Sequence, residues 1–207
     1  QLNGPIRILR AALRKGGAGA ATLAASDSSG ITQGNPEVLL KTSKGDIVVE
    51  LFENDARNTV SNFIELAEKG FYNKDATGNG KQKFIQLVED QAGTPILIQT
   101  GSPTNELEGG PGYTIKGEPN QNRHVRGALS MVQRYLDDEG RFEPDSAGSQ
   151  FFLCLGDIPY YDSLRLTVFG RVTQGLDVLG KLAKDDTIES VEVTKKRNHP
   201  YRVSKTR

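Results

Sequence analysis

The chain has 207 residues, of which 36% are apolar, enough for one domain with a buried core and too many for a disordered chain. Its single cysteine, Cys154, excludes a disulfide framework, and two histidines leave little for a metal centre, so we expect neither a metal nor another cofactor. The 26 basic and 26 acidic side chains cancel, but residues 195–207 carry six basic and no acidic groups, and residues 37–194 are acidic. An acidic body is a poor reader of duplex DNA, and no run approaches the roughly 18–20 apolar residues of a membrane span.

The N-terminal segment, residues 1–36, is expected to lie outside the folded domain. Ile6, Leu9 and Leu13 fall on one face of a predicted basic helix over residues 6–15. Such a helix suits a membrane surface or a partner, or it is the last helix of an upstream region. Residues 16–36 are rich in Gly, Ala and Ser and predict a linker. Because the chain begins at Gln1, we expect a piece of something longer, which leaves the cytoplasm and the cell envelope both open.

The folded domain is predicted to span residues 37–195. Two aliphatic runs, 38–40 and 47–51, flank the turn signal Ser43-Lys44-Gly45-Asp46 and predict a hairpin. Residues 59–69 predict a helix that ends at Gly70, and residues 175–184 predict a second one. Further strands are expected over residues 84–88, 96–99, 128–132, 151–155, 166–172 and 189–194. About eight strands with turn-rich spacing and only two helices predict a mainly β fold, a closed β-barrel.

Two residues with reactive side chains have ordinary structural explanations. Cys154 lies within the apolar run Phe151–Leu155, where a thiol is expected to be a small buried hydrophobe. His124 precedes a strand, and a structural or surface role is the simpler interpretation. No residues combine into a hydrolytic, redox or metal-dependent site. The residues after Lys195 form a basic tail, and a nucleic-acid role for that tail is a minor alternative to a solvated or docked end.

Six ordered segments carry the functional information. They are Thr42-x-x-Gly45-Asp46-Ile47-x-x-Glu50-Leu51-Phe52, Thr59-Val60-x-Asn62-Phe63-x-x-Leu66-x-x-x-Gly70-Phe71-Tyr72, Gln99-x-Gly101, Leu129-Ser130-Met131, Gly148-Ser149-Gln150-Phe151-Phe152 and Val168-Phe169-Gly170-x-Val172. In this order they resemble the cyclophilin-type peptidyl-prolyl cis-trans isomerases over about residues 38–183. The resemblance implies a closed eight-stranded antiparallel barrel capped by two helices, with a proline-binding pocket on its outer face.

The resemblance also implies which residues line the pocket. The position of the family's catalytic arginine falls on Gln86, which is neutral but still offers two N–H donors. The position of the family histidine falls on Leu166, and an assumed one-residue insertion puts the family's aromatic position at Tyr160. Substrate binding is expected from these positions and from Ile96, Leu97, Gln99, Val132, Gln133, Gln150 and Phe152.

Two functions remain open from the sequence. The first is a prolyl isomerase of reduced activity, which acts on X–Pro bonds of peptides or folding proteins with Gln86 as its donor. The second is a catalytically weak or inactive cyclophilin-like module that binds proline peptides or serves as a scaffold. Arg134 or Arg165 could swing in to replace the missing charge. For either function the expected partners are proline-containing peptides or unfolded proteins, and we expect a monomer.

Overall fold

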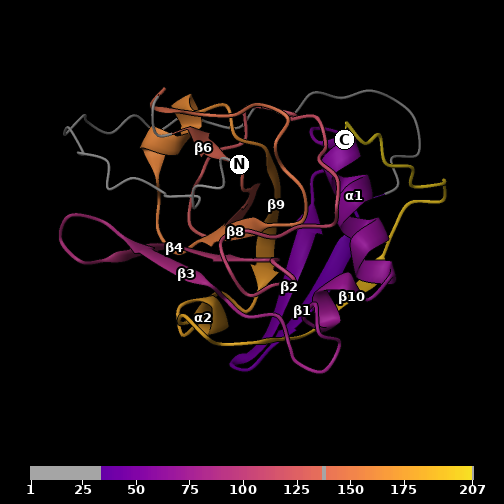
Figure 1. Cartoon of the computed structure of the whole chain (residues 1–207), viewed down its shortest axis with the longest axis horizontal. Helices are drawn as coiled ribbons and strands as arrows, with labels where there is room; N and C mark the ends of the chain where they lie inside the picture. The colour runs from indigo at the N-terminus through magenta and orange to yellow at the C-terminus, as the bar shows by residue number, and fades with distance from the viewer. Residues whose placement is uncertain (1–33, 137–138, 207) are drawn as a thin grey trace.

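A computed structural model describes residues 34–136 and 139–206. The predicted helix over residues 6–15 lies outside the described residues. An eight-stranded antiparallel sheet dominates the described part, with the spatial order β10-β1-β2-β9-β5-β8-β4-β3 (Figure 1). Its strands are β1 (Glu37–Thr42), β2 (Gly45–Leu51), β3 (Gln86–Glu89), β4 (Pro95–Thr100), β5 (Ala128–Met131), β8 (Phe151–Cys154), β9 (Val168–Gln174) and β10 (Ile188–Lys195).

The sheet is curled, so that its two edge strands approach each other. The edges are β3 and β10, and a single bridge between Lys83 and Thr187 connects the segments that precede them. The backbone N–H of Phe84 donates to the Asp186 carbonyl at 2.8 Å beside this bridge. The prediction of a mainly β fold with an antiparallel eight-stranded sheet is therefore confirmed, whereas full closure of the barrel stays a prediction.

The inner face of the sheet packs against helix α1 (Arg57–Glu68), close to the predicted range 59–69. Val60, Phe63 and Ile64 recur at helical spacing and are buried against the strands, as their period predicts. Met131 and Phe169 are each at most 1% exposed and belong to the same buried cluster of strand and helix side chains, here called the inner cluster. The ring centroids of Phe63 and Phe151 lie 5.3 Å apart in an edge-on arrangement, which is a favourable geometry for aromatic rings.

The second helix is much shorter than predicted. Helix α2 covers only Leu176–Leu179, against the expected range 175–184. The apolar stripe behind that expectation is real, because Leu179 and Leu182 are both buried. Gly180 caps the helix, and Leu182 reaches the inner cluster from a turn instead of a helical face. The sequence pattern therefore predicted correctly that the leucines are buried, but it predicted a longer helix than the backbone forms.

The outer face of the sheet carries a second apolar cluster. Its buried members are Leu97, Ala128, Val132, Phe152, Cys154, Ile158, Tyr161, Leu166 and Val168. It is covered by the 3₁₀ helix η2 (Pro159–Ser163) and the chain that follows it. Cys154 is fully buried here, and burial raises the pKa of its thiol far above the ordinary value, in agreement with its predicted role as a small hydrophobe. We call this set the outer cluster.

Two hairpins extend from the strands around the outer cluster. The β3–β4 hairpin projects from the body on the side opposite α1 (Figure 1). A second hairpin, β6 (Tyr135–Leu136) with β7 (Arg141–Phe142), was not predicted because each strand has only two residues. The ring centroids of Tyr135 and Phe142 lie 5.2 Å apart in an edge-on arrangement, and Phe142 also packs on the outer cluster.

The C-terminal residues 196–206, here called the C-terminal strap, fold back onto the domain beside α1 (Figure 1). The buried carboxylate of Glu53, 3% exposed, anchors the strap: Tyr201 donates its hydroxyl at 2.8 Å, and His199 Nε2 lies at 2.5 Å. Further along, Lys205 lies over the ring of Tyr113 at 4.0 Å. The basic groups of the strap are thus placed against acidic and aromatic groups of the domain.

A carboxylate from a distant loop caps the N-terminus of α1. The residue before the helix, Ala56, offers no side-chain cap. Glu118 accepts instead from the backbone N–H groups of Asn58 and Thr59 at 2.9 and 2.7 Å, and from the Thr59 hydroxyl at 2.7 Å. These are N–H groups that a helix leaves without partners, and a negative charge there also suits the helix dipole.

We expect Glu118→Ala to lower the free energy of unfolding by about 1–2 kcal/mol, the usual value of a lost helix cap. Urea unfolding followed by circular dichroism measures the change. Glu106→Ala removes an exposed carboxylate from the connection between β4 and β5, which also carries Glu118. It is the matched control and should leave the free energy of unfolding nearly unchanged. Equal stability of the two variants would show that the cap contributes nothing.

Candidate functional site

Four side chains form a row across four adjacent strands on the outer face. Gln86 of β3 is paired with Gln99 of β4, Gln99 with Phe152 of β8, and Phe152 with Ser130 of β5. Residues directly opposite each other in a sheet share a face, so the four side chains lie side by side. Neighbouring strands are about 4.8 Å apart, and the row therefore spans about 14 Å, the length of roughly four extended peptide residues.

The residues around the row are mainly apolar. Leu97 lies two positions from Gln99 on the same face of β4 and is fully buried, and Val132 and Leu166 are 6% and 4% exposed. All three belong to the outer cluster, and Ile96 packs against it while partly buried. The structure thus brings these four predicted residues together around Phe152. An apolar surface of this kind suits a proline ring.

The amide groups of Gln99 and Gln150 have a defined orientation. Gln150 donates through Nε2 to the carbonyls of Leu107 and Gly109 at 3.0 and 2.8 Å, which fixes its Oε1 as an acceptor. That oxygen accepts from Nε2 of Gln99 at 2.6 Å. The Oε1 of Gln99 is consequently turned the other way, is buried, and has no hydrogen-bond partner among the described residues. A buried acceptor without a partner is costly, and the N–H of a bound peptide would satisfy it.

Gln86 lies at the end of the row with its amide oxygen likewise buried and without a described hydrogen-bond partner. Its side chain is half-buried, so the amide can turn about its last bond to present either the oxygen or the two N–H donors. No hydrogen bond or ion pair of the described residues joins Gln86 to Arg134 or Arg165. Arg134 instead pairs with Glu143 at 3.2 Å.

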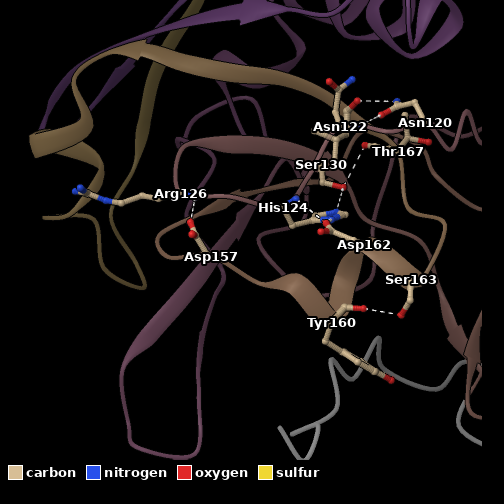
Figure 2. Close-up of polar contacts among 11 residues, drawn as sticks. Asn120, Asn122, His124, Arg126, Ser130, Asp157, Tyr160, Asp162, Ser163 and Thr167 are labelled. Atoms are coloured by element: carbon tan, nitrogen blue, oxygen red, sulfur yellow. Dashed lines mark hydrogen bonds and ion pairs between the residues drawn. The ribbon is translucent and has the colours of Figure 1, made fainter. Parts of the chain in front are cut away.

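Aromatic rings surround Phe152, which is 2% exposed. The ring of His124 stacks on it at 5.9 Å with an interplanar angle of 16°, and Tyr161 meets it edge-on at 5.9 Å. Tyr160, the residue predicted to bind substrate, is 52% exposed and its ring points away from the His124 group (Figure 2). Tyr161, and not Tyr160, is therefore the tyrosine whose ring packs against Phe152.

His124 is held at both ring nitrogens (Figure 2). Its Nδ1 lies 3.0 Å from the Asp162 carboxylate, which also accepts from the His124 backbone N–H at 2.8 Å, and its Nε2 lies 3.1 Å from Ser130 Oγ. The Ser130 hydroxyl also lies within hydrogen-bond distance of the Thr167 carbonyl, at 3.1 Å. Burial lowers the pKa of His124 below its ordinary value of 6.5, although Asp162 acts in the opposite direction.

The Asp162–His124–Ser130 arrangement has the order of a hydrolytic triad but lacks its access. Ser130 is fully buried beside Phe152, and His124 is 2% exposed. A nucleophilic serine must reach a carbonyl carbon from outside, whereas the Ser130 hydroxyl has no exposed surface. The arrangement can therefore support neighbouring side chains but cannot attack a substrate.

Gln133, another residue predicted to bind substrate, is buried at 5% exposure. The next residue, Arg134, lines a cavity of about 280 Å³ together with Thr114, Glu143, Pro144, Asp145, Ser146 and Thr206. The charged lining of this cavity does not suit a proline ring, in contrast to the apolar surface around Phe152. Within residues 34–136 and 139–206, no group of three or more His, Cys, Asp and Glu side chains is arranged to hold a metal ion. No helix in the same ranges is long and apolar enough to cross a membrane.

Sequence reasoning missed Tyr161 and the support of His124 by Asp162. The signal for Tyr161 was present: without the assumed insertion, counting back from Val168-Phe169-Gly170 places Tyr161, not Tyr160, at the family's aromatic position. His124 and Asp162 are 38 residues apart in the sequence, and no sequence pattern predicts their contact.

Comparisons with known proteins identify similar sequences and structures. The family model for the cyclophilin type peptidyl-prolyl cis-trans isomerase/CLD matches residues 37–206. A peptidyl-prolyl cis-trans isomerase of Helicobacter pylori is 44% identical over 156 residues, which cover 73% of this chain and 83% of that protein. One of Synechococcus elongatus is 35% identical over 159 residues, covering 76% and 95%.

Solved structures show the same fold. A cyclophilin-type isomerase of Cryptosporidium parvum matches with a TM-score of 0.64 at 23% identity, covering 79% of this chain and 99% of that one. The same protein in the presence of the dipeptide Ala-Pro matches with a TM-score of 0.63 at 24% identity, covering 77% and 99%. From the family model and the identity to its relatives, the chain belongs to the cyclophilin-type peptidyl-prolyl cis-trans isomerase family.

Proposed function

We propose that the chain isomerises X–Pro bonds of peptides at the row formed by Gln86, Gln99, Phe152 and Ser130, with Gln86 as the donor to the prolyl nitrogen. The observation that carries the proposal is the placement of two buried amide oxygens without described partners beside an apolar floor. Amide groups supply contacts to a peptide backbone, and Phe152 supplies a surface for the ring. The reaction needs no covalent step and no cofactor.

The reaction proposed for these residues is rotation about a single amide bond. Rotation about an X–Pro bond has a barrier of about 18–20 kcal/mol because the amide loses conjugation as it twists. A site accelerates the rotation only if it binds the twisted amide better than the planar isomers. Gln86 can donate an N–H to the prolyl nitrogen, whose lone pair becomes available only in the twisted state. The apolar floor at Phe152 excludes water from one side of the bound amide.

Gln99 gives the site a preference for how the peptide lies. Its free Oε1 is an acceptor, and proline has no backbone N–H to offer it. The donor must therefore come from a residue next to the proline. Gln99 then fixes the flanking backbone, so that the X–Pro bond lies over Phe152 with the prolyl nitrogen toward Gln86.

The second candidate is a binding module that binds proline peptides without catalysing their cis–trans isomerisation. One observation favours it, namely that no described ion pair or hydrogen bond brings a cation to Gln86. Binding through Gln99 and Phe152 would survive this loss. The two functions therefore differ in the exchange rate of the peptide and not in its affinity.

Exchange spectroscopy by NMR on a short Ala-Pro peptide separates the two. We expect cis–trans exchange to become faster than the uncatalysed process, which takes tens of seconds or more. Phe152→Leu, which keeps an apolar but smaller floor, should lower the catalysed rate about tenfold or more. Phe71→Leu removes the same atoms at the inner cluster and is the matched control. Peptide shifts without faster exchange would establish the binding module instead.

A further inference from the structure

The hydrogen bonds around His124 admit two proton states, which differ in one bond. The Asp162 carboxylate can only accept, so Nδ1 of His124 carries a proton in both states. In the neutral ring Nε2 is an acceptor, and Ser130 must turn its hydroxyl proton toward it. In the charged ring Nε2 is a donor, and Ser130 must turn its proton to the Thr167 carbonyl. One proton on His124 thus switches the direction of the Ser130 hydroxyl.

The switch lies directly beneath the proposed proline site. His124 stacks on Phe152, Ser130 is the register partner of Phe152, and Thr167 adjoins Leu166, another residue of the apolar floor. A charge on the ring is therefore placed against the surface that a proline ring would cover. Covering this surface removes nearby water and makes the charged ring more costly.

We propose that His124 is a positioning residue of the proline site, and that its neutral form, protonated at Nδ1, is the form that binds peptide. The inference rests on the proposed function, because it concerns the same site. The Asp162 contact fixes the ring plane, and the parallel ring holds Phe152 in place. Charging His124 turns Ser130 away and puts a cation against the floor. Peptide affinity consequently falls as His124 takes up a proton.

Few other groups could produce the same pH dependence. The titratable groups that the described contacts place against His124 are Asp162 and Tyr161, both on η2, and Cys154 of β8 lies in the same cluster. Burial raises the pKa of Tyr161 and of Cys154 well above their ordinary values, so both stay neutral between about pH 5 and 8. The other histidine, His199, is bound to Glu53 in the C-terminal strap.

The test is the affinity for an Ala-Pro peptide between pH 5.5 and pH 7.5, followed by NMR shift perturbation. We expect binding to weaken about two- to fivefold between pH 7.5 and pH 5.5 if the His124 pKa falls by about 0.5–1 on binding, because the full effect of such a change develops only well below the pKa. His124→Gln should abolish this dependence, and His199→Gln should keep it. A pH dependence that survives in His124→Gln, or a flat profile in the unsubstituted chain, would overturn the proposal. Absence of binding at every pH would instead contradict the proposed function.

A matched pair of aspartates tests the mechanism further. Asp162→Asn removes the charge that supports the protonated ring, so the midpoint of the affinity profile should move to lower pH. Asp157→Asn changes a residue of the same loop that accepts from the Arg126 backbone N–H at 2.8 Å, and should leave the midpoint unchanged (Figure 2). Equal profiles for both variants would contradict the proposal.

If His124→Gln does not fold, the proposal can still be tested by measuring the pKa of His124 in the unsubstituted chain with and without peptide. Binding and protonation are reciprocally linked, so saturating Ala-Pro peptide must lower the pKa that the His124 ring protons report. An unchanged or raised value in the presence of bound peptide would show that His124 has only a structural role.

Discussion

Gln86→Arg is expected to raise kcat/KM for an Ala-Pro peptide about 5- to 150-fold. A charge-assisted hydrogen bond is roughly twice as strong as a neutral one, and an additional 1–3 kcal/mol of stabilisation in the twisted state corresponds to this range. Gln86 is half-buried at the end of the row on β3, so a longer side chain can keep its charged end partly hydrated. The exchange rate of the peptide, measured at several protein concentrations, gives the value directly.

The control for this variant is Glu89→Arg. It places an arginine on the same strand at an exposed position, three residues from the row, and should leave the exchange rate within about twofold. Gln86→Leu, which removes the donor, should lower the rate below that of the unsubstituted chain. No gain in Gln86→Arg would mean that the twisted amide does not meet this side chain, and the assignment of Gln86 would be wrong.

Glu53→Ala is expected to lower the free energy of unfolding by about 3 kcal/mol, the largest stability effect we anticipate. Its buried carboxylate accepts from His199 and Tyr201, and it lies 3.5 Å from Arg197, so its loss leaves two polar groups of the C-terminal strap without their acceptor and removes the negative charge beside Arg197. The same surroundings raise the pKa of Tyr201 to about 12, with burial as the main cause. Urea unfolding measures the loss, and hydrogen exchange shows whether the strap opens first.

Glu192→Ala is the control for the anchor. Glu192 pairs with Lys41 at 2.9 Å, but both side chains are 40% or more exposed. An exposed pair of this kind contributes at most about 1 kcal/mol because water and salt screen it. If Glu53→Ala cost no more than Glu192→Ala, the strap would be a loosely held end.

The sequence predicted most of the sheet because local patterns decide where strands and turns lie. The hairpin β1–β2 follows from two aliphatic runs around Ser43–Asp46, and α1 from the period of its buried residues. The pattern failed at α2, where buried leucines at helical spacing proved compatible with a turn. It also failed at β6–β7, whose strands are too short to carry any periodicity.

Most members of the candidate site could be predicted from the sequence, but Ser130 and Tyr161 were missed, and the arrangement could not be predicted. Gln99 and Phe152 were expected to bind substrate, yet their adjacency is a matter of register between strands more than 50 residues apart. Register depends on the whole sheet and not on either segment. For the same reason the contacts of His124 with Asp162, and of Glu53 with His199, could not be seen in the sequence.

The most direct test of the proposed site is a map of the amides that an Ala-Pro peptide perturbs in the labelled protein. Our account predicts the largest shifts at Gln86, Gln99 and Phe152, including the side-chain NH₂ signals of Gln99 and Gln150. Residues of the charged cavity, such as Arg134 and Asp145, should respond weakly. Shifts centred on that cavity or on the C-terminal strap, with the row unperturbed, would contradict the placement of the proline site at Phe152.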